Sequence, residues 1–152
     1  MSEVEFPKEA YMKLVHVYLN FPGTAEAAFR FYETVFGTTI VGIQTYGNTP
    51  FVGQVPEAVR DKIMNIQLPI TPGVHLMASD SVPGFGPELS VGNNFSIVVV
   101  ADDRAEADRV FGALSSGGEV TMPIANAPWG PYFGMCRDKF GIHWMVSLDH
   151  PV

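Results

Sequence analysis

The C-terminal part of the chain alternates strictly between two kinds of side chain. On one face of an extended strand lie Ile142, Trp144 and Val146, and on the other lie His143, Met145 and Ser147. Residues 138–141 (Asp-Lys-Phe-Gly) are typical of a turn, and residues 132–137 precede it as a second strand. The pattern predicts a β-hairpin over residues 132–148, with Asp138 shaping its turn and Trp144 in the core.

The same alternation occurs earlier in the chain. Segments 73–79 and 141–147 both read Gly, branched apolar, His, large apolar, Met, small apolar, Ser. Segments 15–28 and 95–108 also match, each as a strand followed by the start of a helix, at an offset of 80 residues. Two independent matches indicate an internal duplication of a strand–helix–strands unit.

Each half has the pattern β-α-β-β-β. The first half predicts a helix over 25–36 and strands over 12–21, 38–46, 62–68 and 74–79. Thr24 is the expected N-cap of that helix and Gly37 its C-terminal stop. Its expected apolar stripe is Ala28, Phe31, Tyr32 and Val35.

The second half repeats this order. It predicts a strand over 94–101, a helix that ends near Leu114 with Asp102 or Asp103 as N-cap, a strand over 119–123 and the terminal hairpin. The fold class is therefore α+β: one domain over residues 1–152, with a first βαβββ module over 11–80 and a second over 93–150. Residues 81–92 form the linker, and residues 1–10 are expected to be a loose arm. We expect one curved mixed sheet with helices outside and a cleft on the inner face.

Composition narrows the functional class. The chain has 47% hydrophobic and 16% charged residues, a net charge of −7 and a pI of about 4.9. This charge argues against binding nucleic acid or an anionic membrane surface. The apolar runs are shorter than a membrane helix needs, and the acidic N-terminus is unlike a secretory signal. A single cysteine, Cys136, fits a reducing cytoplasm.

The duplication and several motifs resemble a known group of proteins. The segment Ala28 to Gly37 reads Ala-x-x-Phe-Tyr-x-x-x-Phe-Gly, and with two βαβββ units it resembles the vicinal oxygen chelate superfamily of glyoxalases, bleomycin resistance proteins and extradiol dioxygenases. The C-terminal part resembles its PhnB-like subgroup, also labelled demethylubiquinone methyltransferase-like. The residues that carry this second resemblance are Trp129-Gly130, Gly134-Met135, Asp138, Phe140-Gly141 and Trp144.

The resemblance implies where a divalent metal would bind. In the superfamily's enzymes the ligands come from the first and last strands of each half. The matching positions here are His16, Ser96, Met77 and Met145, and only His16 is a competent ligand for Zn, Ni, Mn or Fe(II), because thioethers suit Cu(I). We therefore expect no metal site of the family's type and no cofactor. A site of three histidines, His16 with His75 and His143, is the alternative arrangement.

The expected pocket is lined by residues on the inner faces of the strands and by an aromatic cluster around the loop at its mouth. They are His16, Tyr18, Met77, Ser96, Trp129, Phe133 and Met145, with His75 and His143 near its rim. Ordinary core packing is the alternative for Met77, Met145 and Trp129.

Cys136 has two interpretations. It is either a small buried hydrophobe or a reactive thiol whose pKa is lowered by Arg137 and Lys139.

Three functions follow as hypotheses. The first is binding of a small apolar or aromatic molecule in the cleft between the modules. The second is a divalent-metal lyase or dioxygenase that uses His16, and the third is an interaction module without a ligand. A methyltransferase function lacks the Gly-rich loop of a cofactor site. The resemblance also implies a homodimer.

Overall fold

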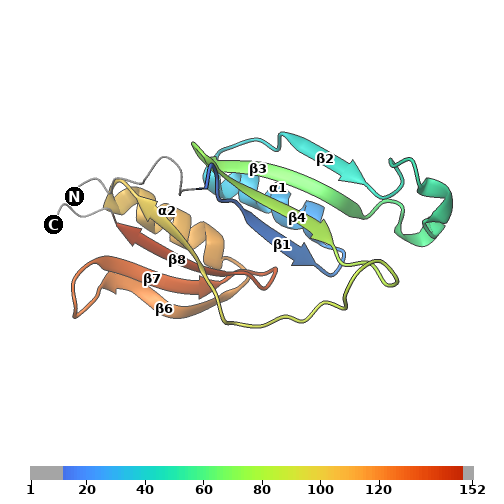
Figure 1. Cartoon of the computed structure of the whole chain (residues 1–152). Coiled ribbons are helices and arrows are strands. Elements are labelled where there is room, and N and C mark those ends of the chain that lie inside the picture. The colour runs from blue at the N-terminus through green and yellow to red at the C-terminus, as the bar shows by residue number, and fades with distance from the viewer. Residues whose placement is uncertain (1–11, 149–152) are drawn as a thin grey trace. The chain divides into compact units, whose positions relative to one another are not determined.

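The computed structural model describes residues 12–148. It divides the chain into two compact units, and the boundary along the chain lies between Ser90 and Val91. The expected arm, residues 1–10, lies outside the described residues, as do residues 149 and 150 of the second module. Figure 1 shows each helix running along one face of its own sheet. The elements are β1 (Val17–Phe21), α1 (Ala25–Phe36), β2 (Gly42–Thr45), the short 3-10 helices η1 (Val52–Gln54) and η2 (Glu57–Val59), β3 (Ile63–Thr71), β4 (Val74–Asp80), β5 (Ile97–Ala101), α2 (Arg104–Ser115), β6 (Glu119–Asn126), β7 (Tyr132–Arg137) and β8 (His143–Leu148).

The α+β class and the two tandem βαβββ modules are confirmed. The expectation of one joined sheet is wrong, because the described strands of each module pair only among themselves and form two four-stranded mixed sheets. The strand orders are β1-β4-β3-β2 and β5-β8-β7-β6. In each module the first strand runs parallel to the last, and the other pairs are antiparallel. The expected cleft between the modules stays a prediction.

Alternation along each strand places the core between sheet and helix. In the first module the buried residues include Leu19, Phe21, Ile66, Leu68, Leu76 and Ala78. Phe21 of β1 meets Phe29 of α1 edge to face, with ring centroids 6.4 Å apart. Phe29 is fully buried, whereas Phe31, which was expected in the apolar stripe, is half-buried. The stripe of α1 is therefore turned toward Phe29, because Phe21 supplies the packing partner on that side.

In the second module, too, the core lies between the sheet and its helix. Trp144 and Val146 of β8 are fully buried on the helix side, as predicted for Trp144. Asp138 shapes the hairpin turn as predicted: its carboxylate accepts hydrogen bonds from the backbone N–H groups of Phe140 and Ile142, and from the Trp144 indole N–H at 2.8 Å. The turn and the core of this module are thus joined through one buried carboxylate.

The helix ends are capped in two ways. Asp103 is the N-cap of α2, and its carboxylate accepts a hydrogen bond from the Glu106 N–H at 2.8 Å. Thr24 occupies the N-cap position of α1, but its side chain makes no capping bond. Instead Asp80, at the end of β4, accepts a bond from the Ala25 N–H at 2.9 Å. Gly37 ends α1 with φ +67°, as predicted, because glycine tolerates the left-handed conformation.

Several strand boundaries differ from those predicted. β1 begins at Val17 and not at residue 12, because the N–H of His75, which would continue the ladder, donates to a side chain. β2 pairs with β3 only from Gly42 onward. β6 continues through Pro123 to Asn126, since an edge strand tolerates the missing proline N–H.

Part of the expected linker belongs to the first module. Val82 is buried, pairs with Phe85 in an isolated β-bridge and packs with Tyr46 and Val55. Among residues 12–148, no helix is long and apolar enough to cross a membrane.

Candidate functional site

Each sheet has an open face, which we define as the face opposite its module's own helix. Buried and less buried side chains alternate along β1 and β4, and the less buried ones lie on the open face of the first sheet. They are Tyr18 and Asn20 from β1, and His75, Met77 and Ser79 from β4, with His16 directly before β1. Tyr18 pairs with Met77, and Met77 with Gln67 of β3. The predicted residues His16, Tyr18, Met77 and His75 therefore share one face.

His16 and His75 form a close pair at one end of this face. Their ring centroids lie 4.9 Å apart, and the backbone N–H of His75 donates to Nδ1 of His16 at 3.0 Å. A neutral imidazole that accepts at Nδ1 carries its proton on Nε2. Both nitrogens of His16 are thereby committed: one accepts a hydrogen bond and the other holds the proton.

This hydrogen bond argues against a metal at His16. A metal-bound histidine normally donates its second N–H to an acceptor, which is the reverse of the arrangement here. In the described part of the chain, no group of three His, Cys, Asp or Glu residues could hold a metal ion. His16, with its ring in this arrangement, therefore does not fit the divalent metal that the superfamily's enzymes imply.

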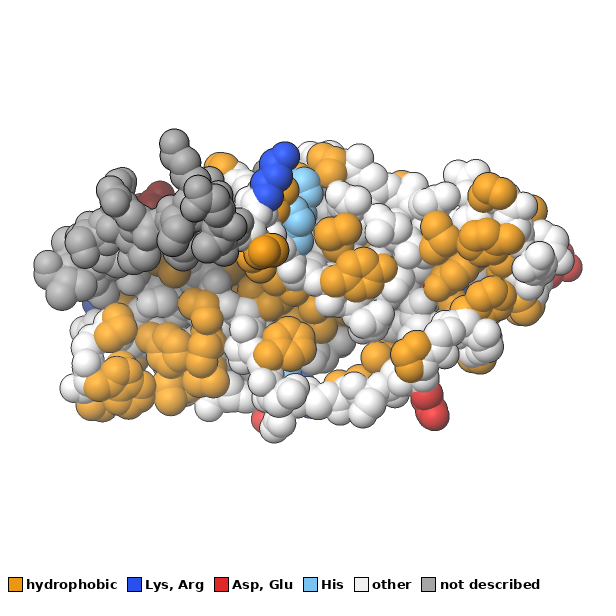
Figure 2. Space-filling model, viewed as in Figure 1, with side chains coloured by type: hydrophobic (Ala, Val, Ile, Leu, Met, Phe, Trp, Pro, Cys, Tyr) orange, Lys and Arg blue, Asp and Glu red, His pale blue; other side chains and the backbone are white. Residues whose placement is uncertain are grey.

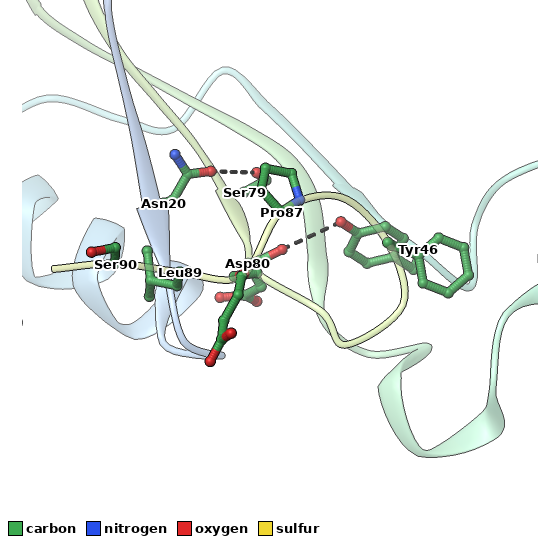
Figure 3. A pocket seen from close by; sticks show the side chains of 10 residues that line it. Asn20, Tyr46, Ser79, Asp80, Pro87, Leu89 and Ser90 are labelled. Atoms are coloured by element: carbon green, nitrogen blue, oxygen red, sulfur yellow. Dashed lines mark hydrogen bonds between the residues drawn. The ribbon is translucent and has the colours of Figure 1, made fainter.

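A hollow of about 360 Å³ lies at the other end of the first module's face. It is lined by the ends of β1 and β4, by Tyr46 and by the segment after β4: Asn20, Tyr46, Ser79, Asp80, Ser81, Phe85, Pro87, Glu88, Leu89 and Ser90. Figure 3 shows the hydroxyl of Ser79 directed at the amide oxygen of Asn20, 3.4 Å away. The hydroxyl of Tyr46 donates to the backbone oxygen of Asp80 at 3.3 Å. Sequence reasoning missed this hollow because the 81–90 segment was assigned to the linker.

The open face of the second sheet is apolar where the first is polar. Val98 of β5 pairs with Met145 of β8, Met145 with Met135 of β7, and Met135 with Met122 of β6. We call these four residues the methionine row. Paired residues of neighbouring strands point to the same face, so their side chains form one continuous strip. Figure 2 shows hydrophobic side chains gathered over the region of β6 and β7.

The sequence indicated only one member of this row, Met145. Met135 could have been found from the period of two within residues 132–137. Met122 could not, because β6 has two register shifts against β7, on either side of Met122.

The other predicted residues of the second module fall at different places. Phe133, Met145 and His143 lie on its open face, and Ser96 directly precedes β5. Trp129 is 68% exposed at the tip of the β6–β7 hairpin, so it does not pack into the core. The chain turns there through hydrogen bonds between Ala127 and the residues Gly130 and Pro131.

Cys136 is a buried hydrophobe and not a reactive thiol. Its side chain is fully buried on the helix side of β7, and burial, with a smaller contribution from Asp138, raises the pKa of the thiol to about 11. The alternative, in which Arg137 and Lys139 lower this pKa, is wrong, because burial and the charge of Asp138 raise it. The thiolate needed for nucleophilic chemistry is therefore scarce at neutral pH.

Two βαβββ modules with these sheet orders define a glyoxalase-like protein. A structure described as a possible glyoxalase from Bacillus cereus superimposes with a TM-score of 0.58 at 19% identity, over 90% of this chain and 99% of that one, which shows the fold alone. Within this superfamily, the chain belongs to the PhnB-like family described as 3-demethylubiquinone-9 3-methyltransferase, whose sequence model matches residues 13–147.

Individual relatives agree with this assignment. Protein PA1353 from Pseudomonas aeruginosa has a crystal structure with a TM-score of 0.79 and 35% identity, over 92% of this chain and all of that one. A PhnB protein from Bacillus cereus, described as a putative 3-demethylubiquinone-9 3-methyltransferase, reaches 0.72 at 26% identity, over 89% of this chain and 98% of its own. Protein YjdN of Escherichia coli (strain K12) is 26% identical over an alignment of 144 residues, which covers 86% of this chain and 92% of YjdN.

Proposed function

We propose that this protein binds a small apolar or aromatic molecule against the methionine row, without a resident divalent metal. The observation that carries the proposal is the row itself: three methionines on adjacent strands, in register and only partly buried. Thioether side chains are flexible and polarisable, so they adapt to apolar ligands of irregular shape and make favourable contacts with aromatic rings.

The neighbours of the row support the same chemistry. Val98 and Val100 of β5 are 54% and 60% exposed, which adds branched apolar surface beside Met145. Phe133 lies next along the same face of β7 and contributes an aromatic ring. A ligand that covers this strip would remove apolar surface from water, at about 25 cal/mol for each Å² of the protein and of the ligand.

The experiment uses isotope-labelled methionine methyl groups followed by NMR, with naphthol as the probe. We expect saturable shifts of the Met122, Met135 and Met145 signals. Met64 packs instead against the cluster of Tyr46, Val55 and Val82 in the first module, so its signal should stay in place. The variant Met135→Gln should weaken naphthol binding, because it places an amide in the middle of the row. Its matched control is Met12→Gln, since Met12 is highly exposed and outside the row.

Two results would contradict the proposal. One is the absence of any shift of the three signals up to about millimolar naphthol, the range of the weakest specific binding. The other is equal naphthol affinity in Met135→Gln and the control.

A divalent-metal lyase or dioxygenase that uses His16 has less support, because the ring of His16 is committed to the bond with His75. It would require a stoichiometric bound metal and a melting temperature that falls on chelation, with both effects lost in His16→Ala. Elemental analysis of untagged protein, followed by melting curves with added Zn, Ni, Mn and Fe(II), decides between the two functions. The homodimer that the family resemblance implies stays a prediction, which light scattering of the purified chain would test.

A further inference from the structure

The hollow of the first module is built from parts that the proposed function does not use. All ten of its lining residues belong to the first unit of the chain, whereas the methionine row belongs to the second. Its volume of about 360 Å³ lies within the usual range for small-molecule sites. The chemistry of its wall therefore indicates a ligand of its own.

The charge of the wall is negative. Two of the lining residues, Asp80 and Glu88, are acidic, and none is Lys, Arg or His. Asp80 is buried, and its two carboxylate oxygens accept the N–H groups of Ala25 and Ile63. Glu88 is exposed at the rim. Because both carboxylate oxygens of Asp80 are already bonded, Glu88 is the lining carboxylate left for a ligand. With no basic side chain in the lining, the hollow favours cations over anions, in a chain that already carries a net charge of −7.

One wall of the hollow is aromatic. The rings of Tyr46 and Phe85 lie with centroids 5.9 Å apart, at an interplanar angle of 50°. The hydrogen bond from the Tyr46 hydroxyl to Asp80 fixes the first ring, and burial raises the pKa of that hydroxyl, so Tyr46 stays neutral. The faces of such rings attract an organic ammonium group through the cation–π interaction.

Another part of the wall offers hydrogen bonds. Asn20 and Ser79 meet at 3.4 Å, which is long for a hydrogen bond, so both groups keep capacity for a ligand hydroxyl. Ser81 and Ser90 add two more hydroxyl groups. Figure 3 shows the Ser79–Asn20 contact and the Tyr46–Asp80 hydrogen bond as two separate contacts in the wall of the hollow.

We propose that this hollow binds a small organic ammonium ion that also carries a hydroxyl group, with the cation between Glu88 and the Tyr46–Phe85 rings and the hydroxyl against Asn20 and Ser79. This site is separate from the methionine row and does not depend on it.

The test compares choline with dimethylbutanol, the neutral alcohol in which carbon replaces the choline nitrogen. The two molecules have nearly the same shape, so a difference in affinity reports the charge alone. We expect choline to bind roughly three- to thirtyfold more tightly than the alcohol, the range of a partly desolvated cation–π and ionic contact. The methyl signal of Met64, which packs against the cluster of Tyr46, Val55 and Val82, should move with choline while the methionine-row signals stay in place.

Two variants localise the site. Glu88→Gln should weaken choline binding severalfold and leave dimethylbutanol binding unchanged, because Glu88 is exposed and its loss removes only charge. Its matched control is Glu57→Gln, an exposed glutamate of the same module outside the hollow, which should bind choline like the unaltered protein. Phe85→Leu removes one ring and should weaken choline binding as well, with a melting curve to confirm that the variant is folded.

Three results would overturn this inference. They are equal affinity for choline and dimethylbutanol, no choline binding up to about 10 mM, and unchanged choline affinity in both Glu88→Gln and Phe85→Leu. Failure here would leave naphthol binding intact, and failure of the naphthol experiment would leave the choline result intact, because different methionine signals report the two sites.

Discussion

The two modules share one topology, yet matching positions of their open faces carry different side chains. The row that crosses the first sheet reads Tyr18, Met77, Gln67, Gly42, and the corresponding row of the second reads Val98, Met145, Met135, Met122. Only the methionine of the last strand is common to both. The apolar residues of the buried face set the register of each strand. The residues of the open face can therefore differ between the modules. The duplicated unit thus provides one polar surface and one apolar surface.

On the buried faces, the large and the small residue of a cross-strand pair change places between the two modules. In the first module the small residue Ala78 of β4 pairs with the large Ile66 of β3. In the second, the large Val146 of β8 pairs with Gly134 of β7. Each pair combines one large and one small residue, so the sheet can approach its helix equally well in both modules.

The modules are also held by different carboxylates. Asp80 and Asp138 are the buried charged residues in the part of the chain that the structure describes. Asp80 joins the start of α1 to the start of β3 across long sequence separations, whereas Asp138 serves groups within six residues of itself. The first module is thus anchored by a distant contact and the second by a local one.

The largest effect should come from removing these carboxylates. Asp80→Ala removes the acceptor of the buried N–H groups of Ala25 and Ile63. Asp138→Ala removes the acceptor of the Trp144 indole N–H. We expect each to lower the free energy of unfolding by about 2–5 kcal/mol, since each unsatisfied buried donor costs about 1–3 kcal/mol. Urea unfolding measures both. The exposed Asp102→Ala is the control, and a loss in either variant no larger than in this control would refute the anchoring role.

Next in size is Gly134→Ala. An added Cβ would lie 2.8 Å from Cβ of Ile124 and 2.9 Å from a ring carbon of Phe111, so neighbouring atoms must move. We expect a loss of about 1–3 kcal/mol from overpacking. Gly42→Ala in the first module is the matched control, because nothing lies within 4 Å of its added Cβ. Equal thermal unfolding of the two variants would contradict the claim that Gly134 must be small because its pairing partner is large.

The buried thiol should make stability fall at alkaline pH. The pKa of Cys136 is raised from an ordinary 9.0 to about 11, so the unfolded chain loses this proton first. The unfolded state then binds fewer protons than the folded state, and stability falls as pH rises from about 9 to about 11. We expect this contribution to be about 1–3 kcal/mol, at 1.36 kcal/mol for each unit of pKa.

To isolate the contribution of the thiol to stability, urea unfolding of the unaltered protein is compared with that of Cys136→Ala between about pH 8 and about pH 11. This range spans the ordinary and the raised pKa of the thiol. The difference in stability between the two proteins should shrink over this range. A constant difference would show that the thiol titrates normally in the folded protein.

The smallest effect concerns the two helix caps. Asp103→Ala should cost about 1 kcal/mol, the usual worth of an N-cap hydrogen bond. Thr24→Ala should change stability by only a few tenths of a kcal/mol, because the side chain of Thr24 makes no capping bond. Thermal unfolding of both variants is the measurement. If Thr24→Ala lost more stability than Asp103→Ala, the claim that α2 is capped by its own N-cap side chain and α1 by the distant Asp80 would be contradicted.

Local signals were sufficient for much of the fold. The helix over residues 25–36 and the strand over residues 132–137 were predicted with the boundaries that the structure shows. The roles of Trp144, Asp138 and Gly37 were also predicted correctly. Each depends on neighbours within a few residues, or on a periodicity that sequence displays directly.

The errors concern contacts between distant residues. Asp80 lies 55 residues from Ala25, so nothing near Thr24 signals that the cap is supplied from β4. The bond between His75 and His16 spans 59 residues, and it decides both where β1 begins and how His16 is used. Val82 lies in the segment 81–92 that was assigned to the linker, but its packing partners, Tyr46 and Val55, lie far back in the chain.

By itself the sequence determined the duplication, the α+β class, the family and the face on which most candidate residues lie. These follow from periodicity and from motifs that repeat along the chain. The tertiary structure alone decided the register between strands, and with it the methionine row, the committed ring of His16 and the hollow beside Asp80. Register depends on which strands pair and on where bulges shift them, and these are properties of the folded sheet that no single segment encodes.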